Sequence, residues 1–196
     1  MVACHMQNEL DILREVSERL ESAGIAFMLT GSVAMNYYAQ PRMTRDIDLV
    51  VALGESDVEA FAQLFAADYY LDRQAVMRAV ASRSIFNLIH SDSVIKVDFI
   101  VLKTDAYRQD EFARRQRIRL GDFQTWIVCR EDLILSKLYW ARGSRSELQL
   151  RDVRNLLALE CDVEYLRRQA QRLGIDEMLT EVVTTEASDA TEASDE

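Results

Sequence analysis

Two apolar, β-rich segments of the chain contain aspartates, and this feature restricts the fold more than any other. The first segment, DIDLVVAL, covers residues 46–53, and the second, VIKVDFIVL, covers residues 94–102. Residues two apart in a strand project from the same face, about 7 Å apart along the chain. We therefore predict two strands, the first of which presents the carboxylates of Asp46 and Asp48 on one face.

Paired carboxylates repel each other, and one of them takes up a proton more easily unless a cation holds both ionised. Their oxygens are hard ligands, which suit Mg²⁺ or Mn²⁺. Asp98 presents a related problem, because its segment is suited to a buried central strand, where an isolated carboxylate is costly. We therefore expect a divalent cation at Asp46 and Asp48, and either a cation or a basic partner to compensate Asp98.

Ordinary ion pairs are the alternative explanation for these aspartates. Asp46 would then end a turn, and Asp48 would pair with Arg42 or Arg45. Asp98 would pair with Lys96 or with another basic residue. For each aspartate taken alone, the ion pair is the better explanation, so the choice depends on the segment that precedes them.

A Gly-Ser pair in that preceding segment favours the metal ion. The segment IAFMLTGS, residues 25–32, ends in Gly31 and Ser32, and VAMNYYA follows with the apolar spacing of a helix. We predict a strand, a tight turn and a helix. A glycine turn at a helix N-terminus exposes backbone N–H groups and a hydroxyl, which bind phosphate oxygens. Together with three carboxylates on two strands, this turn supplies what metal-assisted phosphoryl or nucleotidyl transfer requires.

Apolar periodicity predicts the remaining elements. Segments with helical spacing cover residues 8–23, 56–67, 131–142, 147–160 and 163–173, and a hairpin joins residues 84–90 to 94–102. We expect an α/β (α+β) fold, in which helices flank a small mixed β-sheet core over residues 1–125. A C-terminal helical bundle follows over residues 126–178. The acidic end has too few apolar residues to fold, so we expect a disordered tail over residues 179–196.

Composition excludes several classes of protein. The first residues lack the basic and then apolar pattern of a secretory signal, and no segment approaches the roughly 18 apolar residues that span a bilayer. We therefore expect a cytoplasmic protein with no membrane partner. Cys4, Cys129 and Cys161 are far apart and lack metal-ligand spacing, so we expect reduced thiols.

The net charge of −10 argues against broad electrostatic capture of nucleic acid. One basic run stands out within FARRQRIRLGDF, and its members are Arg114, Arg115, Arg117 and Arg119. Such a run is usually a solvated face. If the chain acts on RNA, these arginines are our first candidates for phosphate contact.

The segment TGSVAMNYYAQPRMTRDIDLVV, residues 30–51, resembles the signature of the DNA polymerase β-like nucleotidyltransferases, in which Gly-Ser precedes an Asp-x-Asp strand. Its RMTRDID part is most similar to the AbiEii/MenT branch, minimal nucleotidyltransferases that are often toxins of toxin–antitoxin pairs. The resemblance covers residues 25–102, with Asp98 as the third carboxylate. It extends more loosely to Lys137 and Asp152, where the chain departs from the family pattern by having Arg151 in place of lysine.

The resemblance implies a role for each matching residue. Asp46 and Asp48 would bind the metal that holds the triphosphate, and all three aspartates would share a second metal. Asp98 would also help to deprotonate the attacking hydroxyl. The residues expected to bind the nucleotide are Gly31, Ser32, Arg42 and Lys137.

The expected reaction transfers a nucleoside monophosphate from a nucleoside triphosphate to an acceptor hydroxyl. A tRNA end or a protein side chain is the acceptor that the toxin-like resemblance implies, with a cognate antitoxin as partner. A small molecule is the alternative acceptor, as in aminoglycoside-modifying relatives. A non-catalytic, nucleotidyltransferase-like module that binds a protein is the alternative of another class. Retention of Gly31, Ser32 and all three aspartates favours the enzyme.

Overall fold

The chain divides into two compact units. The first comprises Met1–Ala34 and Arg42–Val128, and the second comprises Met35–Pro41 and Cys129–Glu196. The computed structural model describes residues 8–44, 46–144 and 146–192. The sheet and the three predicted aspartates belong to the first unit, and a helical bundle forms most of the second.

Within the described residues, a seven-stranded mixed sheet forms the centre of the first unit, in the order β3-β4-β5-β2-β1-β7-β6. The strands are β1 (Phe27–Thr30), β2 (Asp46–Val51), β3 (Tyr69–Tyr70), β4 (Ile85–His90), β5 (Lys96–Val101), β6 (Gln116–Leu120) and β7 (Phe123–Ile127). β2 is parallel to β5 and β1 is parallel to β7, whereas the other neighbours are antiparallel. The predicted α/β fold with a mixed sheet is confirmed, as is the hairpin of β4 and β5.

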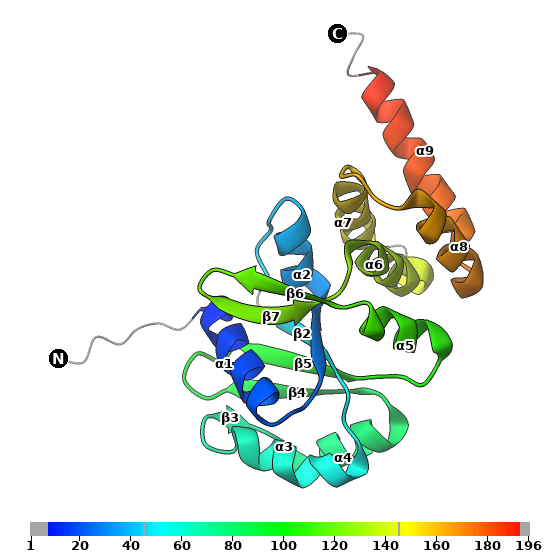
Figure 1. Cartoon of the computed structure of the whole chain (residues 1–196). Helices are drawn as coiled ribbons and strands as arrows, with labels where there is room; N and C mark the ends of the chain where they lie inside the picture. Colours follow the sequence, from blue (N-terminus) through cyan, green and yellow to red (C-terminus); the bar gives the residue numbers. More distant parts are fainter. Residues whose placement is uncertain (1–7, 45, 145, 193–196) are drawn as a thin grey trace, which may run out of the picture. The chain divides into compact units, whose positions relative to one another are not determined.

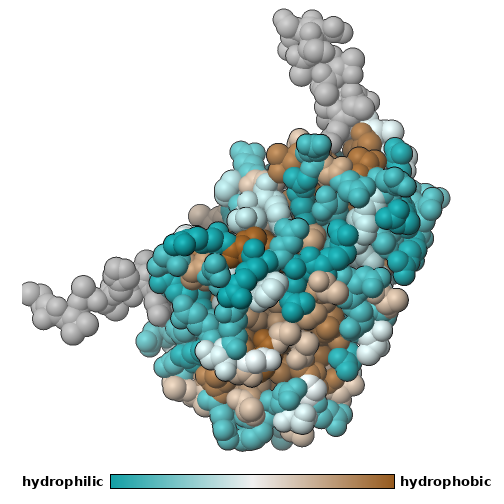
Figure 2. Space-filling view, viewed as in Figure 1, coloured by the Kyte–Doolittle hydropathy of each residue, from teal (hydrophilic) through white to brown (hydrophobic). Residues whose placement is uncertain are grey.

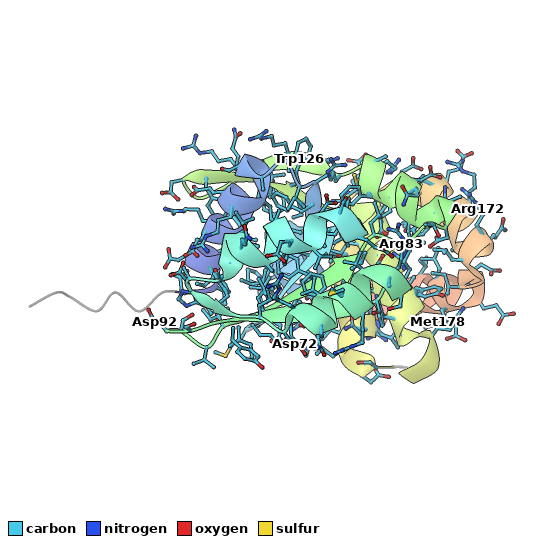
Figure 3. The ribbon with its side chains drawn as sticks, turned by 90° about the horizontal axis from the view of Figure 1, so that it is seen from below. Asp72, Arg83, Asp92, Trp126, Arg172 and Met178 are labelled. Carbon is cyan, nitrogen blue, oxygen red and sulfur yellow. The ribbon has the colours of Figure 1, made fainter. Side chains whose placement is uncertain are left out.

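Short helices accompany this sheet. They are α1 (Glu9–Ser22), the first half of α2 (Gly31–Tyr38), the 3₁₀ helix η1 (Glu55–Asp57), α3 (Val58–Phe65), α4 (Arg73–Ser82) and α5 (Ala106–Ala113). Local chemistry explains their ends. The N-cap of α4 is Asp72, whose carboxylate accepts hydrogen bonds from the backbone N–H groups of Gln74 and Ala75. Its C-cap is Arg83, which has a left-handed backbone, and Figure 3 labels both caps.

Strand alternation separates an apolar face of the sheet from a polar one. The buried residues of the two central parallel strands are Ile47, Leu49, Val51, Val97, Phe99 and Val101. On this face, Phe61 of α3 makes edge contacts with Phe86 and Phe99, at 5.4 and 5.3 Å between ring centroids. Figure 1 shows α3 and α4 side by side near strands β3 and β4. The residues between the buried ones, which include the aspartates, therefore project from the opposite face.

Most of the molecular face drawn in Figure 2 is hydrophilic, and hydrophobic residues gather in smaller areas of it. None of the helices in the described part of the chain combines the length and the apolar character needed to cross a membrane. The cytoplasmic location stays a prediction.

Four helices make up most of the second unit, within the residues that the structure describes. They are α6 (Arg130–Ser144), α7 (Glu147–Leu157), α8 (Val163–Leu173) and α9 (Asp176–Glu192). The predicted C-terminal helical bundle is present. Helical structure extends into the segment for which we expect a disordered tail, because Leu179 and Val182 of α9 are buried and α9 packs on α7 and α8. Residues 193–196 lie outside the described residues.

Candidate active site

The three predicted aspartates project from one face of two neighbouring strands. In the parallel pair of β2 and β5, Asp48 lies directly opposite Asp98, and Asp46 lies opposite Lys96. Neighbouring strands are about 4.8 Å apart. Sequence periodicity predicts that Asp46 and Asp48 share a face, and the register adds Asp98 to that face.

Gly31 brings the helix N-terminus of α2 against Asp48. Its φ of +65° is a conformation that favours glycine. A Cβ atom at this position would lie only 2.6 Å from Cγ of Asp48, which is closer than real Cβ contacts. Thr30, the preceding residue, pairs with Asp48 across β1 and β2. The predicted turn and the predicted carboxylate pair are therefore in direct contact.

Ser32 and Arg42 extend this site. An Nη atom of Arg42 donates a hydrogen bond of 2.7 Å to Oγ of Ser32, which lies in the first turn of α2. The first N–H groups of a helix have no partner inside the helix, and they favour anions. Arg42 adds a fixed positive charge beside them. This arrangement suits the oxygens of a triphosphate.

Lys96 places a cation among the carboxylates. Its Nζ atom lies 2.8 Å from Oδ2 of Asp98 and 3.6 Å from Oδ1 of Asp46. The hydrogen bond with Asp98, together with both negative charges, raises the pKa of Lys96 above its ordinary value. The ion pair that we considered as an alternative for Asp98 is therefore present.

The donor chemistry of this face suits a divalent metal ion. Carboxylate oxygens from Asp46, Asp48 and Asp98 are the kind of ligand that Mg²⁺ and Mn²⁺ prefer. In the described part of the chain, no three acidic, histidine or cysteine side chains form a ready-made ion cage. Asp98 is engaged with Lys96 instead, so the aspartates fit a metal ion by their chemistry and shared face rather than as a preformed cage.

Lys137 belongs to the second unit, where it forms a buried ion pair. Its Nζ atom lies 2.7 Å from Oδ2 of Asp152 and 3.3 Å from Oε1 of Gln149. The two charged side chains are only 5% and 1% exposed. The structure thus brings together the two residues that the family resemblance singles out there. A nucleotide-binding role for Lys137 stays a prediction.

Two polar residues beside the aspartates are missing from the sequence-based site. Thr30 of β1 pairs with Asp48, and Asn87 of β4 pairs with Asp98. These four residues form a polar row across β1, β2, β5 and β4. In the sequence, Asn87 stands out as a polar residue within the apolar run IFNLIH. Its position beside Asp98, however, depends on the register of the hairpin.

No protein-family model matches this chain, and no curated protein sequence matches it either. Solved structures do resemble it. An antigenic nucleotidyltransferase-like protein from Paracoccidioides brasiliensis is 18% identical, with a TM-score of 0.63, and the match covers 93% of this chain and 91% of that one.

Two antibiotic-modifying proteins are also similar in structure. The lincomycin-bound lincosamide antibiotic adenylyltransferase LnuA is 12% identical with a TM-score of 0.53, and the match covers 78% of this chain and 98% of that one. The complex of ANT(2″)-Ia with adenylyl-2″-tobramycin is 13% identical with a TM-score of 0.51, covering 83% and 94%. The narrower AbiEii/MenT likeness stays a prediction. The fold of this chain is therefore similar to the folds of these nucleotidyltransferase-like and adenylyltransferase structures.

Proposed function

We propose that this chain is a metal-dependent nucleotidyltransferase, which transfers a nucleoside monophosphate from a nucleoside triphosphate to an acceptor hydroxyl. One observation carries the proposal: Asp48 lies opposite Asp98 on one side and contacts the Gly31 turn on the other. A phosphate-binding helix end and a carboxylate pair thus meet at one residue. Nucleotidyl transfer needs both, because the triphosphate must be held while its α-phosphate is attacked.

Different residues of the first unit bind the triphosphate and accept the proton of the acceptor hydroxyl. The N-terminus of α2, with Ser32, holds the β- and γ-phosphate oxygens, and Arg42 neutralises negative charge on them. Asp98 accepts the proton of the attacking hydroxyl.

Asp46, Asp48 and Asp98 would hold Mg²⁺ or Mn²⁺ in this proposal. A bound divalent ion supplies charge neutralisation and polarises phosphoryl oxygens. Gly31 supports metal binding indirectly, because its lack of a side chain leaves room for Asp48 beside the helix N-terminus. Support for the metal rests on this donor set and on the family resemblance.

Transfer of radioactive label tests the proposal. The protein is incubated with each of the four α-phosphate-labelled ribonucleoside triphosphates, Mg²⁺ or Mn²⁺, and either total RNA or cell extract. Asp48→Asn is the inactive variant that we expect. Asp92→Asn is its matched control, because Asp92 is exposed in the turn between β4 and β5 and is labelled in Figure 3. Equal label transfer by wild type and Asp48→Asn would contradict the proposal.

An arginine surface, formed by Arg117 and Arg119 of β6 and by Arg114 and Arg115 just before it, supports RNA as the acceptor. Arg114, Arg117 and Arg119 are exposed, and the guanidinium carbons of Arg115 and Arg117 lie 4.9 and 5.7 Å from the ring centroid of Trp126. Figure 3 labels Trp126. Such stacking orients the guanidinium groups. Arg117 also meets Glu21 at 3.4 Å, an exposed ion pair that phosphate can replace at little cost.

Strand register puts Trp126, and Arg117 that pairs with it, on the same side of the sheet as the aspartates. Leu29 pairs with both Leu49 and Ile127, so these three residues share the apolar face. Trp126 precedes Ile127 and therefore projects from the opposite face. Asp48, which precedes Leu49, does the same. An RNA lying across Trp126 would therefore be on the aspartate side of the sheet.

The double variant Arg117→Gln/Arg119→Gln tests the RNA acceptor. We expect it to lower transfer to RNA, and to reduce the slope of log affinity against log salt by about one for each lost phosphate contact. Triphosphate binding should not change. Arg73→Gln/Arg78→Gln, which alters two exposed arginines of α4, is the matched control. Equal RNA affinity in all three proteins would exclude this surface and favour a protein or small-molecule acceptor.

The structural similarity to antibiotic-modifying proteins favours a small-molecule acceptor. The size of the labelled product distinguishes such an acceptor from RNA or protein.

A cognate antitoxin is the partner that the AbiEii/MenT likeness implies. Co-expression with the product of the neighbouring gene tests that partner, because an antitoxin should suppress label transfer. The non-catalytic module predicts partner binding with no transfer at all, and Asp48→Asn should leave that binding intact.

A further inference from the structure

The ammonium group of Lys96 occupies a position between carboxylates of two strands. Strand alternation puts Lys96 and Asp98 on the same face of β5, and the parallel register puts Asp46 opposite Lys96. The result is one ammonium group at 2.8 Å from Asp98 and 3.6 Å from Asp46. Both aspartates are residues to which the proposed function assigns metal binding.

We propose that Lys96 is the resident cation of this carboxylate cluster, and that a divalent metal ion must displace its ammonium group from Asp98 in order to bind. This inference rests on the proposed function. It adds that the Lys96 ammonium group competes with the metal ion for the carboxylates. Lys96 thereby acts as a positioning residue, which prevents the carboxylates from repelling one another before metal and nucleotide arrive. It also weakens metal binding until the triphosphate contributes its own oxygens.

An ordinary surface ion pair is the competing explanation, because Lys96 is 37% exposed and exposed pairs contribute little to stability. Two features distinguish Lys96 from such a pair. It contacts carboxylates on two different strands. Those two carboxylates also flank Asp48, which lies opposite Asp98, so a change at Lys96 acts on the whole cluster.

A lysine at residue 96 is also easier for a metal ion to displace than an arginine would be. The chain has 20 arginines and only three lysines, Lys96, Lys103 and Lys137. A lysine ammonium is a compact charge on a flexible stem with three rotatable donors, whereas the arginine fork prefers a fixed, bidentate partner. A lysine can therefore serve two carboxylates and then move aside.

Direct titration with Mn²⁺, followed by the electron paramagnetic resonance signal of the free ion, tests the inference without reference to activity. Lys96→Met removes the charge and keeps most of the side-chain volume. Lys103→Met is the matched control, because it removes the same charge roughly 20 Å farther along an extended segment, where salt screens its effect. Lys96→Arg keeps the charge. Circular dichroism checks that each variant folds, and Lys96→Gln replaces Lys96→Met if that variant does not.

We expect Lys96→Met to bind Mn²⁺ about thirtyfold more tightly than wild type, the effect of removing one positive charge at about 4 Å from a divalent ion in water. Lys103→Met should stay within about twofold, and Lys96→Arg should bind no more tightly than wild type. Mn²⁺ should also raise the melting temperature of Lys96→Met more than that of wild type.

Two other results would overturn the inference in different ways. If wild type binds Mn²⁺, Asp48→Asn abolishes that binding and Lys96→Met binds with unchanged or lower affinity, then Lys96 is no competitor and the proposed function stands. If neither wild type nor any variant binds Mn²⁺, with or without a nucleoside triphosphate, then the inference and the proposed metal-dependent function both fail.

Discussion

Gly31 and Asp48 are packed so closely that a side chain at residue 31 has no room. A Cβ atom would lie 2.6 Å from Cγ and 2.8 Å from Cβ of Asp48. The glycine also has a φ of +65°. Both the space and the backbone therefore require glycine at the point where the helix N-terminus meets the carboxylate.

Gly31→Ala should destabilise the protein by about 2 kcal/mol or more, because it adds a steric conflict to the strain of a left-handed backbone. Gly121→Ala is the matched control, since Gly121 has a similar φ of +63° and a Cβ atom added there would meet nothing within 4 Å. It should show the backbone strain alone, about 1 kcal/mol. Urea denaturation measures both, and an equal loss of stability in the two variants would exclude the contact with Asp48.

Arg42→Gln should weaken the binding of a nucleoside triphosphate about tenfold, because Arg42 supplies the positive charge beside Ser32 at the start of α2. Ser32→Ala should have a smaller effect, since backbone N–H groups of the helix remain. Isothermal titration with a non-hydrolysable triphosphate measures both. Arg78→Gln, which alters an exposed arginine of α4, should bind like wild type. Wild-type affinity in Arg42→Gln would remove Arg42 from the site.

The buried ion pair of Lys137 and Asp152 should be sensitive to removal of either partner. Lys137→Met or Asp152→Asn leaves the other group buried without its counter-charge, which costs about 3–5 kcal/mol. The double variant should lose less stability than the sum of the single variants. Urea denaturation of wild type, the two single variants and the double variant completes this double-mutant cycle. Additive losses would show that the two groups are not coupled.

Tyr69 should make stability fall at alkaline pH. Burial, with the nearby charge and hydrogen bond of Glu15, raises the pKa of its phenol above the ordinary value of 10.0. The unfolded chain then loses this proton at a lower pH than the folded protein does. The stabilisation is therefore complete below about pH 10 and declines as the pH rises further.

Tyr69→Phe should flatten the decline in melting temperature between about pH 10 and pH 12. Tyr70→Phe is the control, because the adjacent Tyr70 is 70% exposed and Tyr69 is 4% exposed. It should keep the wild-type profile. If Tyr69→Phe declines as steeply as wild type does, another group is responsible.

Local periodicity made parts of the site predictable. An Asp-x-Asp strand places Asp46 and Asp48 on one face whatever the rest of the chain does. Gly31 could be placed at a turn because its segment passes from strand to helix composition. Asp98, in contrast, meets Asp48 only through the parallel register of β2 and β5. That register depends on the sheet order, which no local pattern contains.

Other features could not be read from local pattern. The β6 segment QRIRL has arginines on its exposed face, and the strand lies at an edge of the sheet, so its sequence looks like a charged loop. Helix α9 extends into a segment with few apolar residues, because burial of Leu179 and Val182 depends on neighbouring helices. Charge patterns suggested Lys96 as a partner of Asp98, but its contact with Asp46 needed the structure.

The position of the transferred label tests the central claim most directly. Wild type is incubated with Mg²⁺ and a nucleoside triphosphate labelled either at the α-phosphate or at the γ-phosphate, together with its acceptor. Nucleotidyl transfer predicts that the α-label enters the product, that the γ-label leaves in pyrophosphate, and that Asp48→Asn does neither. Entry of the γ-label into the product, or unchanged transfer by Asp48→Asn, would contradict the account.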